Sequence, residues 1–262
     1  MLADYHVHTI FSDDSVNPMM SAVQQAIQLG LDEICFTEHI DFGVKTTENC
    51  DCEAYWKELR RCREQAEGQI IIRSGMEFGM QIHTIPQFRQ TFDSYPFDFI
   101  ILSCHQVEDQ EFWRYEFQEG RSQEEYNRRY YEEILKVIQQ YDDYSVLGHL
   151  DMIRRYDKAG EYPFEKVRDI VDEILRHVIA AGKGIEVNTS CYRYKLPGLT
   201  PSREILRRYR ELGGEVITIG SDAHDNKWIG CKIAETQQEL KEMGFRSVCT
   251  YERMRPIPHA IP

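Results

Sequence analysis

Histidines and acidic residues recur in short clusters along this sequence, and each cluster follows an apolar segment typical of a β-strand. In chain order the clusters are His6-Val7-His8, Glu38-His39, Glu77, His105, His149 with Asp151, and Asp222-Ala223-His224. Six of the nine histidines lie in these clusters, and the others are His83, His177 and His259. Chance would scatter histidines over helix surfaces and loops, so this ordered pattern predicts one site assembled from distant parts of the chain.

The spacing within the clusters suits metal binding. Side chains alternate along an extended strand, so the rings of His6 and His8 point to the same side and reach one metal ion. Asp222 and His224 repeat this spacing near the other end of the chain. Mixed imidazole and carboxylate ligands favour zinc, manganese or iron over calcium and magnesium. The ligands are too many for one ion and carboxylates are able to bridge ions, so we expect two or three divalent metal ions.

Two neighbouring aspartates, Asp13 and Asp14, follow the first cluster within Phe11-Ser12-Asp13-Asp14. One of them is close enough in sequence to join the metal ligands. The other fits a turn that flanks the next helix, where Asn17 is the better helix cap because Asn is a preferred N-cap residue.

Closely spaced metal ions hold a hydroxide at neutral pH and bind the oxygens of a phosphate group during in-line displacement. Phosphate-ester hydrolysis by a metal-activated hydroxide is therefore the chemistry that these residues predict. Neither the GxSxG serine motif nor the GxxxxGK[ST] phosphate loop occurs in the sequence. The acid that protonates the leaving group could be a metal-held water, Glu38 or Asp151. The two carboxylates could instead support the metal ligands from outside the ligand set.

Candidate substrate-binding residues follow two of the later clusters. A guanidinium at Arg154 or Arg155 could bind phosphate through two parallel hydrogen bonds, although a loop arginine paired with an acid is the alternative. Weaker candidates are Asn188, Ser190 and Arg193, and Asn188 could instead hold backbone at the rim of the fold.

Strand and helix patterns that could position these residues alternate along the chain. Strands are predicted at residues 3–8, 33–37, 70–77, 97–103, 145–147, 184–188 and 216–219, with helical patterns between them. Asn17, Ser122 and Thr200-Pro201 are the predicted starts of three of those helices. This order predicts a parallel sheet with helices outside it, a fold that binds ligands at the carboxyl ends of its strands. Residues 106–121 are predicted to form a loop over one end of the sheet, and the tail after Arg255 to be extended.

The bulk composition narrows the functional classes. The 262 residues fit one domain, spanning 1–262, and the net charge of -13 argues against a nucleic-acid partner. No apolar run approaches the roughly 18 residues that a membrane helix needs, and the first residues lack a signal-peptide pattern. The eight cysteines form no CxxC pair and are expected to be reduced thiols. We therefore expect a cytoplasmic enzyme with a small phosphorylated substrate and no membrane partner.

The ordered motifs resemble those of the PHP (polymerase and histidinol phosphatase) superfamily. They are His6-x-His8, Thr37-Glu38-His39, Gly75-Met76-Glu77, His105, Gly148-His149-Leu150-Asp151 and Gly220-Ser221-Asp222-Ala223-His224. Glu186-Val187-Asn188-Thr189-Ser190 and Ile153-Arg154-Arg155 are similar to the histidinol-phosphatase branch. The resemblance implies a distorted seven-stranded (β/α) barrel with up to three metal ions.

The resemblance also implies a set of ligands and an activity. The implied ligands are His6, His8, Asp14, His39, Glu77, His105, His149, Asp222 and His224. The position of Asp14 is a histidine in some relatives, and other relatives have the aspartate where Asp13 stands. The implied activity is hydrolysis of L-histidinol phosphate in histidine biosynthesis, and the alternative is a phosphatase or phosphodiesterase for another small phosphate ester or nucleotide.

Two further classes explain the sequence less well. An amidohydrolase also begins with HxH on a barrel strand, but that family uses a bridging lysine at the fourth strand, where this sequence has His105. It would also leave His39 and Glu77 unexplained. A domain in which metals only stabilise the fold would not need so complete a set of ligands, because structural sites have no open coordination position.

Overall fold

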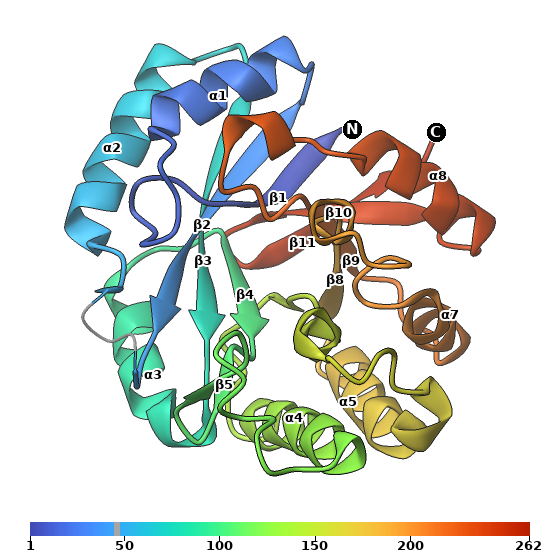
Figure 1. Ribbon diagram of the computed structural model, residues 1–262. Coiled ribbons are helices and arrows are strands. Elements are labelled where there is room, and N and C mark those ends of the chain that lie inside the picture. The colour runs from blue at the N-terminus through green and yellow to red at the C-terminus, as the bar shows by residue number, and fades with distance from the viewer. Residues whose placement is uncertain (45–47) are drawn as a thin grey trace.

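Seven parallel strands form the centre of the molecule in the computed structural model, which describes residues 1–44 and 48–262 (Figure 1). They are β1 (Ala3–Val7), β2 (Glu33–Asp41), β3 (Ile71–Gly79), β4 (Phe99–Ser103), β7 (Val146–Leu147), β8 (Gly184–Asn188) and β9 (Ile217–Gly220), and they are hydrogen-bonded in that order. The two ends of the sheet meet where Val7 pairs with Ala223, and the amide of His8 donates to the Ala223 carbonyl at 2.9 Å. The predicted distorted seven-stranded (β/α) barrel is confirmed.

Helices surround this barrel (Figure 1). They are α1 (Met19–Gln28), α2 (Cys52–Gln65), α3 (Ile85–Ser94), α4 (Gln123–Ile138), α5 (Arg168–Ala180), the short α6 (Cys191–Tyr194), α7 (Arg203–Glu211) and α8 (Ile233–Glu242). Helix α5 shows the pattern that positions these helices: its apolar residues Ile170, Ile174 and Val178 are buried at helical spacing. Of the helices that the structure describes, none is both long enough and apolar enough to cross a membrane.

Two strands extend further than the sequence pattern predicted. Strand β2 continues to Asp41 and β3 to Gly79, so His39 lies inside a strand instead of following it, and Glu77 lies inside β3 instead of at its end. The two residues are direct neighbours in the register of β2 and β3. Because neighbours across a parallel pair point to the same face, this register alone brings the imidazole and the carboxylate together.

Two predicted helix starts are wrong. Helix α1 begins at Met19 after Pro18 and has no side-chain cap, so Asn17 does not cap it. Helix α7 is capped by Ser202, whose hydroxyl accepts from the amide of Ile205, and not by Thr200-Pro201. At Ser122 the prediction is confirmed, because its hydroxyl accepts from the amide of Glu125 at the start of α4.

An antiparallel hairpin of β10 (Ser247–Glu252) and β11 (Arg255–Ala260) packs against the sheet at the amino-terminal ends of its strands. The ring of Tyr251 lies 4.9 Å from that of Phe99, and the Tyr251 amide donates to the hydroxyl of Tyr5 at 2.6 Å. The tail is extended as expected, but β10 and helix α8 were not predicted. Residues 106–121 also contain a small hairpin of β5 (Gln106–Val107) and β6 (Gln110–Glu111) where a loop was expected.

Candidate metal centre

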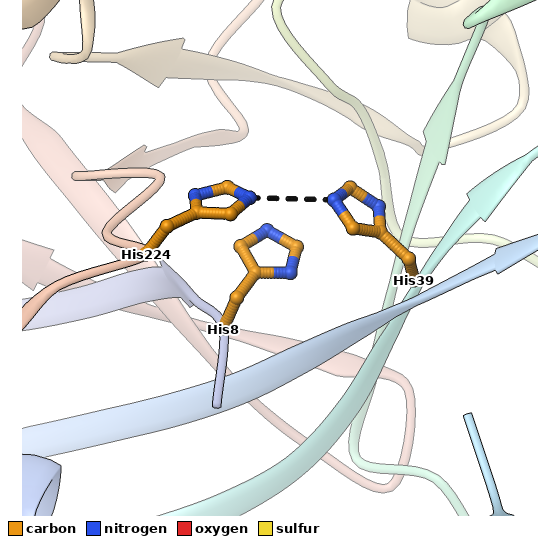
Figure 2. Close-up of side chains that lie close together, drawn as sticks. All are labelled: His8, His39 and His224. Atoms are coloured by element: carbon orange, nitrogen blue, oxygen red, sulfur yellow. Dashed lines mark hydrogen bonds between the residues drawn. The ribbon is translucent and has the colours of Figure 1, made fainter. Parts of the chain in front are cut away.

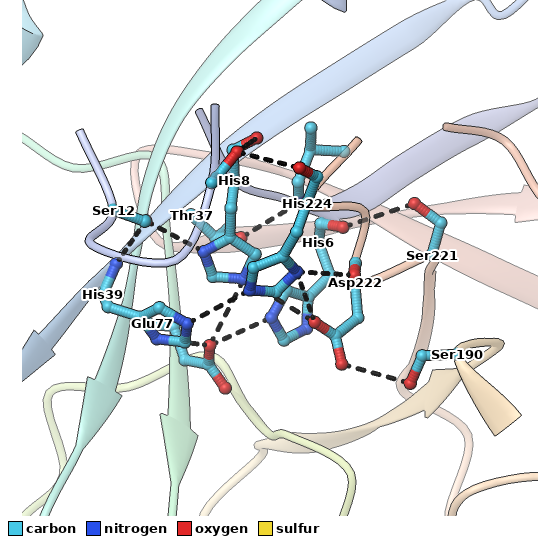
Figure 3. Close-up of polar contacts among 12 residues, drawn as sticks. His6, His8, Ser12, Thr37, His39, Glu77, Ser190, Ser221, Asp222 and His224 are labelled. Carbon is cyan, nitrogen blue, oxygen red and sulfur yellow. Dashed lines mark hydrogen bonds and ion pairs between the residues drawn. The ribbon is translucent and has the colours of Figure 1, made fainter. Parts of the chain in front are cut away.

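Glu77 contacts histidines of the cluster that the sequence pattern predicted, some of which are drawn in Figure 3. It is only 1% exposed, and its two carboxylate oxygens face histidines from four different parts of the sheet. Oε1 lies 2.7 Å from Nε2 of His149 and 3.1 Å from Nε2 of His105. Oε2 lies 3.1 Å from Nε2 of His6, 3.1 Å from Nδ1 of His39 and 3.5 Å from Nε2 of His8. A carboxylate whose two oxygens both face candidate ligands could help to hold more than one metal ion.

Three imidazole rings lie together in one part of the cluster (Figure 2). The ring of His8 lies between those of His39 and His224, with centroids 4.2 Å from each. Asp14 reaches the same group, because its carboxylate lies 3.6 Å from Nε2 of His39 and 3.1 Å from Nε2 of His224. Nε2 of His8 is buried and has no hydrogen-bond partner. A buried nitrogen lone pair surrounded by other ligands is the environment that a metal cation satisfies.

The ligand atoms form four overlapping groups, in each of which they lie within 4.8 Å of one another. The groups are His8 with His39 and His224, His6 with His8 and Asp222, His6 with Glu77 and His149, and His39 with Glu77 and His105. The structure therefore brings together every predicted ligand, with Asp14 at the edge of the first group. Each of four residues belongs to two groups, namely His6, His8, His39 and Glu77. This overlap is compatible with several bound ions rather than one.

Four of the histidines are held through their Nδ1 atoms, which leaves Nε2 facing the cluster. The partners of Nδ1 are Glu186 for His6 at 2.5 Å, the Ser12 hydroxyl for His8 at 3.1 Å, Asp41 for His105 at 2.8 Å and the Asp222 carbonyl for His224 at 2.9 Å. An acceptor at Nδ1 fixes the ring orientation and the tautomer that presents a bare Nε2. The residues present therefore fit a metal centre.

The proton on His8 can be assigned from its neighbours. Ser12 donates its one hydroxyl proton to Glu38 at 2.6 Å, and its oxygen accepts from the amide of His39 at 3.1 Å. Nδ1 of His8 must then be the donor to Ser12, which leaves Nε2 unprotonated. Glu38 also accepts from the amide and hydroxyl of Thr9 at 2.9 and 2.6 Å and does not line the cavity beside the cluster. Glu38 therefore orients the Ser12 hydroxyl, which in turn accepts the hydrogen bond from His8.

The electrostatics of the cluster favour ionised carboxylates and a neutral His8. Burial lowers the pKa of His8 well below its ordinary value, and charge on His224 and His39 lowers that pKa further. Burial would raise the pKa of Glu77, but the neighbouring His6, His105 and His39 hold it well below its ordinary range. Imidazole must be neutral and carboxylate ionised to bind a metal ion, so these two residues are in the required states.

A cavity of about 300 Å³ opens onto the cluster. The metal-ligand candidates on its wall are Asp14, His39, Glu77, His105, His149, Asp222 and His224. Facing them are Trp113, Met152, Arg155, Tyr156 and Tyr194, and Asp41 completes the wall. The expected role of residues 106–121 over one end of the sheet is supported by Trp113, which comes from this segment. The cavity has the size and the mixed polar and aromatic lining of a small-molecule site.

Arg155 and its neighbours surround Asp222 at one side of the cavity. The Arg155 guanidinium donates to Asp222 at 3.0 Å and to Ser190 at 2.5 Å, and Asn188 accepts from it at 3.3 Å. Arg193 lies 3.5 Å from the other oxygen of Asp222. Asn188, Ser190 and Arg193 therefore contact the candidate ligand Asp222 and Arg155, and none of the three forms part of the cavity wall.

Arg154 and Asp151 lie away from the cavity. Asp151 is 1% exposed and accepts from Arg154 at 2.9 Å and from the amide of Ser202 at 2.8 Å. Arg154 also donates to Glu161 and to the Leu199 carbonyl. Asp151 therefore does not line the cavity beside the cluster, and Arg154 matches the alternative of a loop arginine paired with acids.

Three supporting residues escaped the sequence analysis: Glu186, Asp41 and Ser12. A signal existed for Glu186, because a charged residue in the middle of a buried apolar strand requires a partner. Asp41 was missed because β2 was expected to end at Thr37. Ser12 carries no signal that distinguishes it from a turn serine.

Known proteins with similar sequences belong to the family whose motifs this site resembles. The model of the PHP domain family matches residues 4–190 of the chain. The histidinol-phosphatase of Lactococcus lactis subsp. lactis (strain IL1403) is 34% identical over 258 residues, which cover 96% of this chain and 95% of that protein. A "Probable histidinol-phosphatase" of Clostridium acetobutylicum is 28% identical over 260 residues, covering 97% of this chain and 98% of that protein.

A solved structure is similar over nearly the whole fold. It is the histidinol phosphate phosphatase of Lactococcus lactis subsp. lactis Il1403 complexed with zinc, L-histidinol and phosphate. The TM-score is 0.88 at 32% sequence identity, and the match covers 97% of this chain and 98% of that one.

Proposed function

The chain belongs to the PHP domain family, and we propose that it hydrolyses L-histidinol phosphate to L-histidinol and phosphate. The observation that carries the proposal is the bridge-like environment of Glu77, beside a cavity of about 300 Å³ that suits a small phosphate ester. The similarity to the Lactococcus lactis enzyme, which was solved with L-histidinol and phosphate, supports this substrate. Such a reaction belongs to histidine biosynthesis.

We propose that the cluster holds two or three divalent ions of zinc, manganese or iron. The ligands would be His6, His8, Asp14, His39, Glu77, His105, His149, Asp222 and His224, with Glu77 as a bridge. When bound, such ions lower the pKa of a water molecule to about 7 and neutralise charge on the phosphate oxygens. The zinc in the related structure supports the choice of metal, and the overlapping groups support more than one ion.

On the protein side, Arg155 would supply positive charge to the phosphate. Arg155 lines the cavity, and its contacts with Asp222 and Ser190 hold its guanidinium in one orientation. A fixed guanidinium loses little conformational freedom when it binds an anion. Trp113 and Tyr156, whose rings are 6.4 Å apart, would enclose the organic part of the substrate and exclude water from the reacting phosphate. We assign no substrate contact to Arg154.

Release of inorganic phosphate by the metal-loaded protein tests the proposal. L-Histidinol phosphate is compared with sugar phosphates and nucleotides at matched concentrations. We expect the highest kcat/KM for L-histidinol phosphate, and equal or faster turnover of another ester would contradict the named substrate.

Replacement of one ligand links that activity to the cluster. His8→Ala should abolish phosphate release and lower the metal content, because it removes a nitrogen that two of the ligand groups share. His177→Ala is the matched control, since His177 lies in the last turn of α5 outside the cluster. A fully active His8→Ala variant without metal would contradict the assignment.

A further inference from the structure

Glu186 lies within β8 and joins two strands that carry candidate metal ligands. We propose that Glu186 is a positioning residue that keeps the proton of His6 on Nδ1, so that Nε2 of His6 is free to bind a metal ion. This inference rests on the metal centre of the proposed function and extends it to a residue outside the ligand set.

The two carboxylate oxygens of Glu186 have different hydrogen-bond partners. Oε2 accepts from the backbone amide of His149 at 2.8 Å and from the side-chain amide of Asn188 at 3.2 Å. Oε1 faces Nδ1 of His6 at 2.5 Å. The Asn188 amide lies 3.5 Å from the same Nδ1, too far to compete with the carboxylate. Because Glu186 is 1% exposed, water does not replace these partners.

A glycine on the neighbouring strand β9 makes room for this carboxylate. A Cβ at Gly220 would lie 2.5 Å from Oε1 of Glu186 and 2.3 Å from Cβ of His6. Any larger residue at Gly220 would push Glu186 and His6 apart, so the packing is specific for their direct contact.

The contact between Glu186 and His6 affects two of the ligand groups, because His6 belongs to both. His6 belongs to the group with His8 and Asp222 and to the group with Glu77 and His149. Its Nε2 lies 3.1 Å from the Glu77 carboxylate. A proton moved from Nδ1 to Nε2 would remove the lone pair that both groups share.

Glu186→Gln is predicted to cause this change of tautomer. An amide has one acceptor end and one donor end, and two donors, the His149 amide and the Asn188 amide, already face the Oε2 position. The glutamine oxygen should stay there, which turns the NH₂ group toward Nδ1 of His6. Nδ1 must then accept, and the ring proton moves to Nε2.

Metal retention tests the proposal without reference to the substrate. Chelator competition with the zinc-loaded protein should show a 10- to 100-fold lower affinity in Glu186→Gln, the usual effect of losing a partner that orients a ligand. Glu33→Gln is the matched control, because Glu33 is equally buried but lies at the opposite end of the barrel beside Arg73. An affinity of Glu186→Gln within twofold of wild type would overturn the proposal.

A measurement on the unaltered protein covers the case in which the variant does not fold. In ¹⁵N–¹H spectra of the zinc-loaded wild type, with His6 identified by its loss in a His6→Gln sample, Nδ1 of His6 should carry the proton. A bare or metal-bound Nδ1 would overturn the proposal. Neither readout involves L-histidinol phosphate, so a protein that hydrolysed another ester would refute the proposed substrate and leave this inference standing.

Discussion

Replacement of Glu77 by glutamine is the perturbation whose effect the structure defines best. The variant keeps the shape of the side chain but removes its charge and converts one oxygen into an NH₂ donor. Both oxygens of Glu77 face imidazole nitrogens, with the closest contacts at 2.7 Å to His149 and 3.1 Å to His6. In either orientation of the amide, the NH₂ group therefore faces nitrogens that are expected to bind metal.

The size of the effect follows from the burial of the carboxylate. Removing one partner of a buried charge pair costs about 3–5 kcal/mol, because the remaining charge has no compensation. At 1.4 kcal/mol for each tenfold change, metal affinity should fall by roughly two to three and a half powers of ten. Phosphate release should fall at least in proportion, since Glu77 belongs to two of the ligand groups.

The assay combines metal content after dialysis against a chelator with phosphate release from L-histidinol phosphate. Glu133→Gln serves as the control, because Glu133 is also buried but accepts from the amide of Ile82 on the outer side of the barrel. We expect the control to retain its metal and activity. A Glu77→Gln variant with wild-type metal content and wild-type kcat would refute the role of Glu77 as a bridge.

Three other changes have defined outcomes. Ser12→Ala removes the acceptor of His8 Nδ1–H, so chelator titration should show a 10- to 100-fold loss of metal affinity, and unchanged affinity would exclude a role for Ser12. Arg154→Gln leaves Asp151 without its ion pair and should lower the free energy of unfolding by about 3–5 kcal/mol in urea titrations. The kcat of this variant should stay close to wild type, and a large loss would place Arg154 in the substrate site after all. Asp172 is held by two hydrogen bonds from Arg208, which lower its pKa below the ordinary 3.8, so this pair stabilises the fold above that pH and the stabilisation is lost as pH falls further. The stability difference between wild type and Asp172→Asn should therefore shrink as the pH falls from the ordinary 3.8 through the lower pKa of the folded state, and a pH-independent difference would contradict it.

The order of the strands and the convergence of the candidate ligands on one site could be predicted from the sequence because both depend on local patterns. The alternation that places His6 and His8 on one side of a strand is a property of the strand itself. The order of apolar segments then brings distant strand ends to one edge of the sheet, which is why His149 and His224 could be assigned to the same site as His6.

The supporting contacts could not be predicted because they depend on register and on the ends of elements. His39 and Glu77 become neighbours only because β2 and β3 pair in one particular register. Asp41 supports His105 only because β2 continues past Thr37, and tertiary pairing rather than local propensity decides that length. Likewise, Arg154 and Arg155 are adjacent in sequence, yet the 3-10 helix Met152–Tyr156 turns only Arg155 toward the cavity.

Reconstitution of metal-free protein tests the central claim most directly. Protein stripped by a chelator is titrated with zinc, manganese or iron(II) while bound metal and phosphate release from L-histidinol phosphate are measured together. We predict no hydrolysis without metal, and activity that rises to its maximum when two or three ions are bound per chain. Full hydrolysis by protein with less than about one metal ion in ten chains, where a cluster of this kind would supply almost no activated water, would contradict a metal-dependent phosphatase.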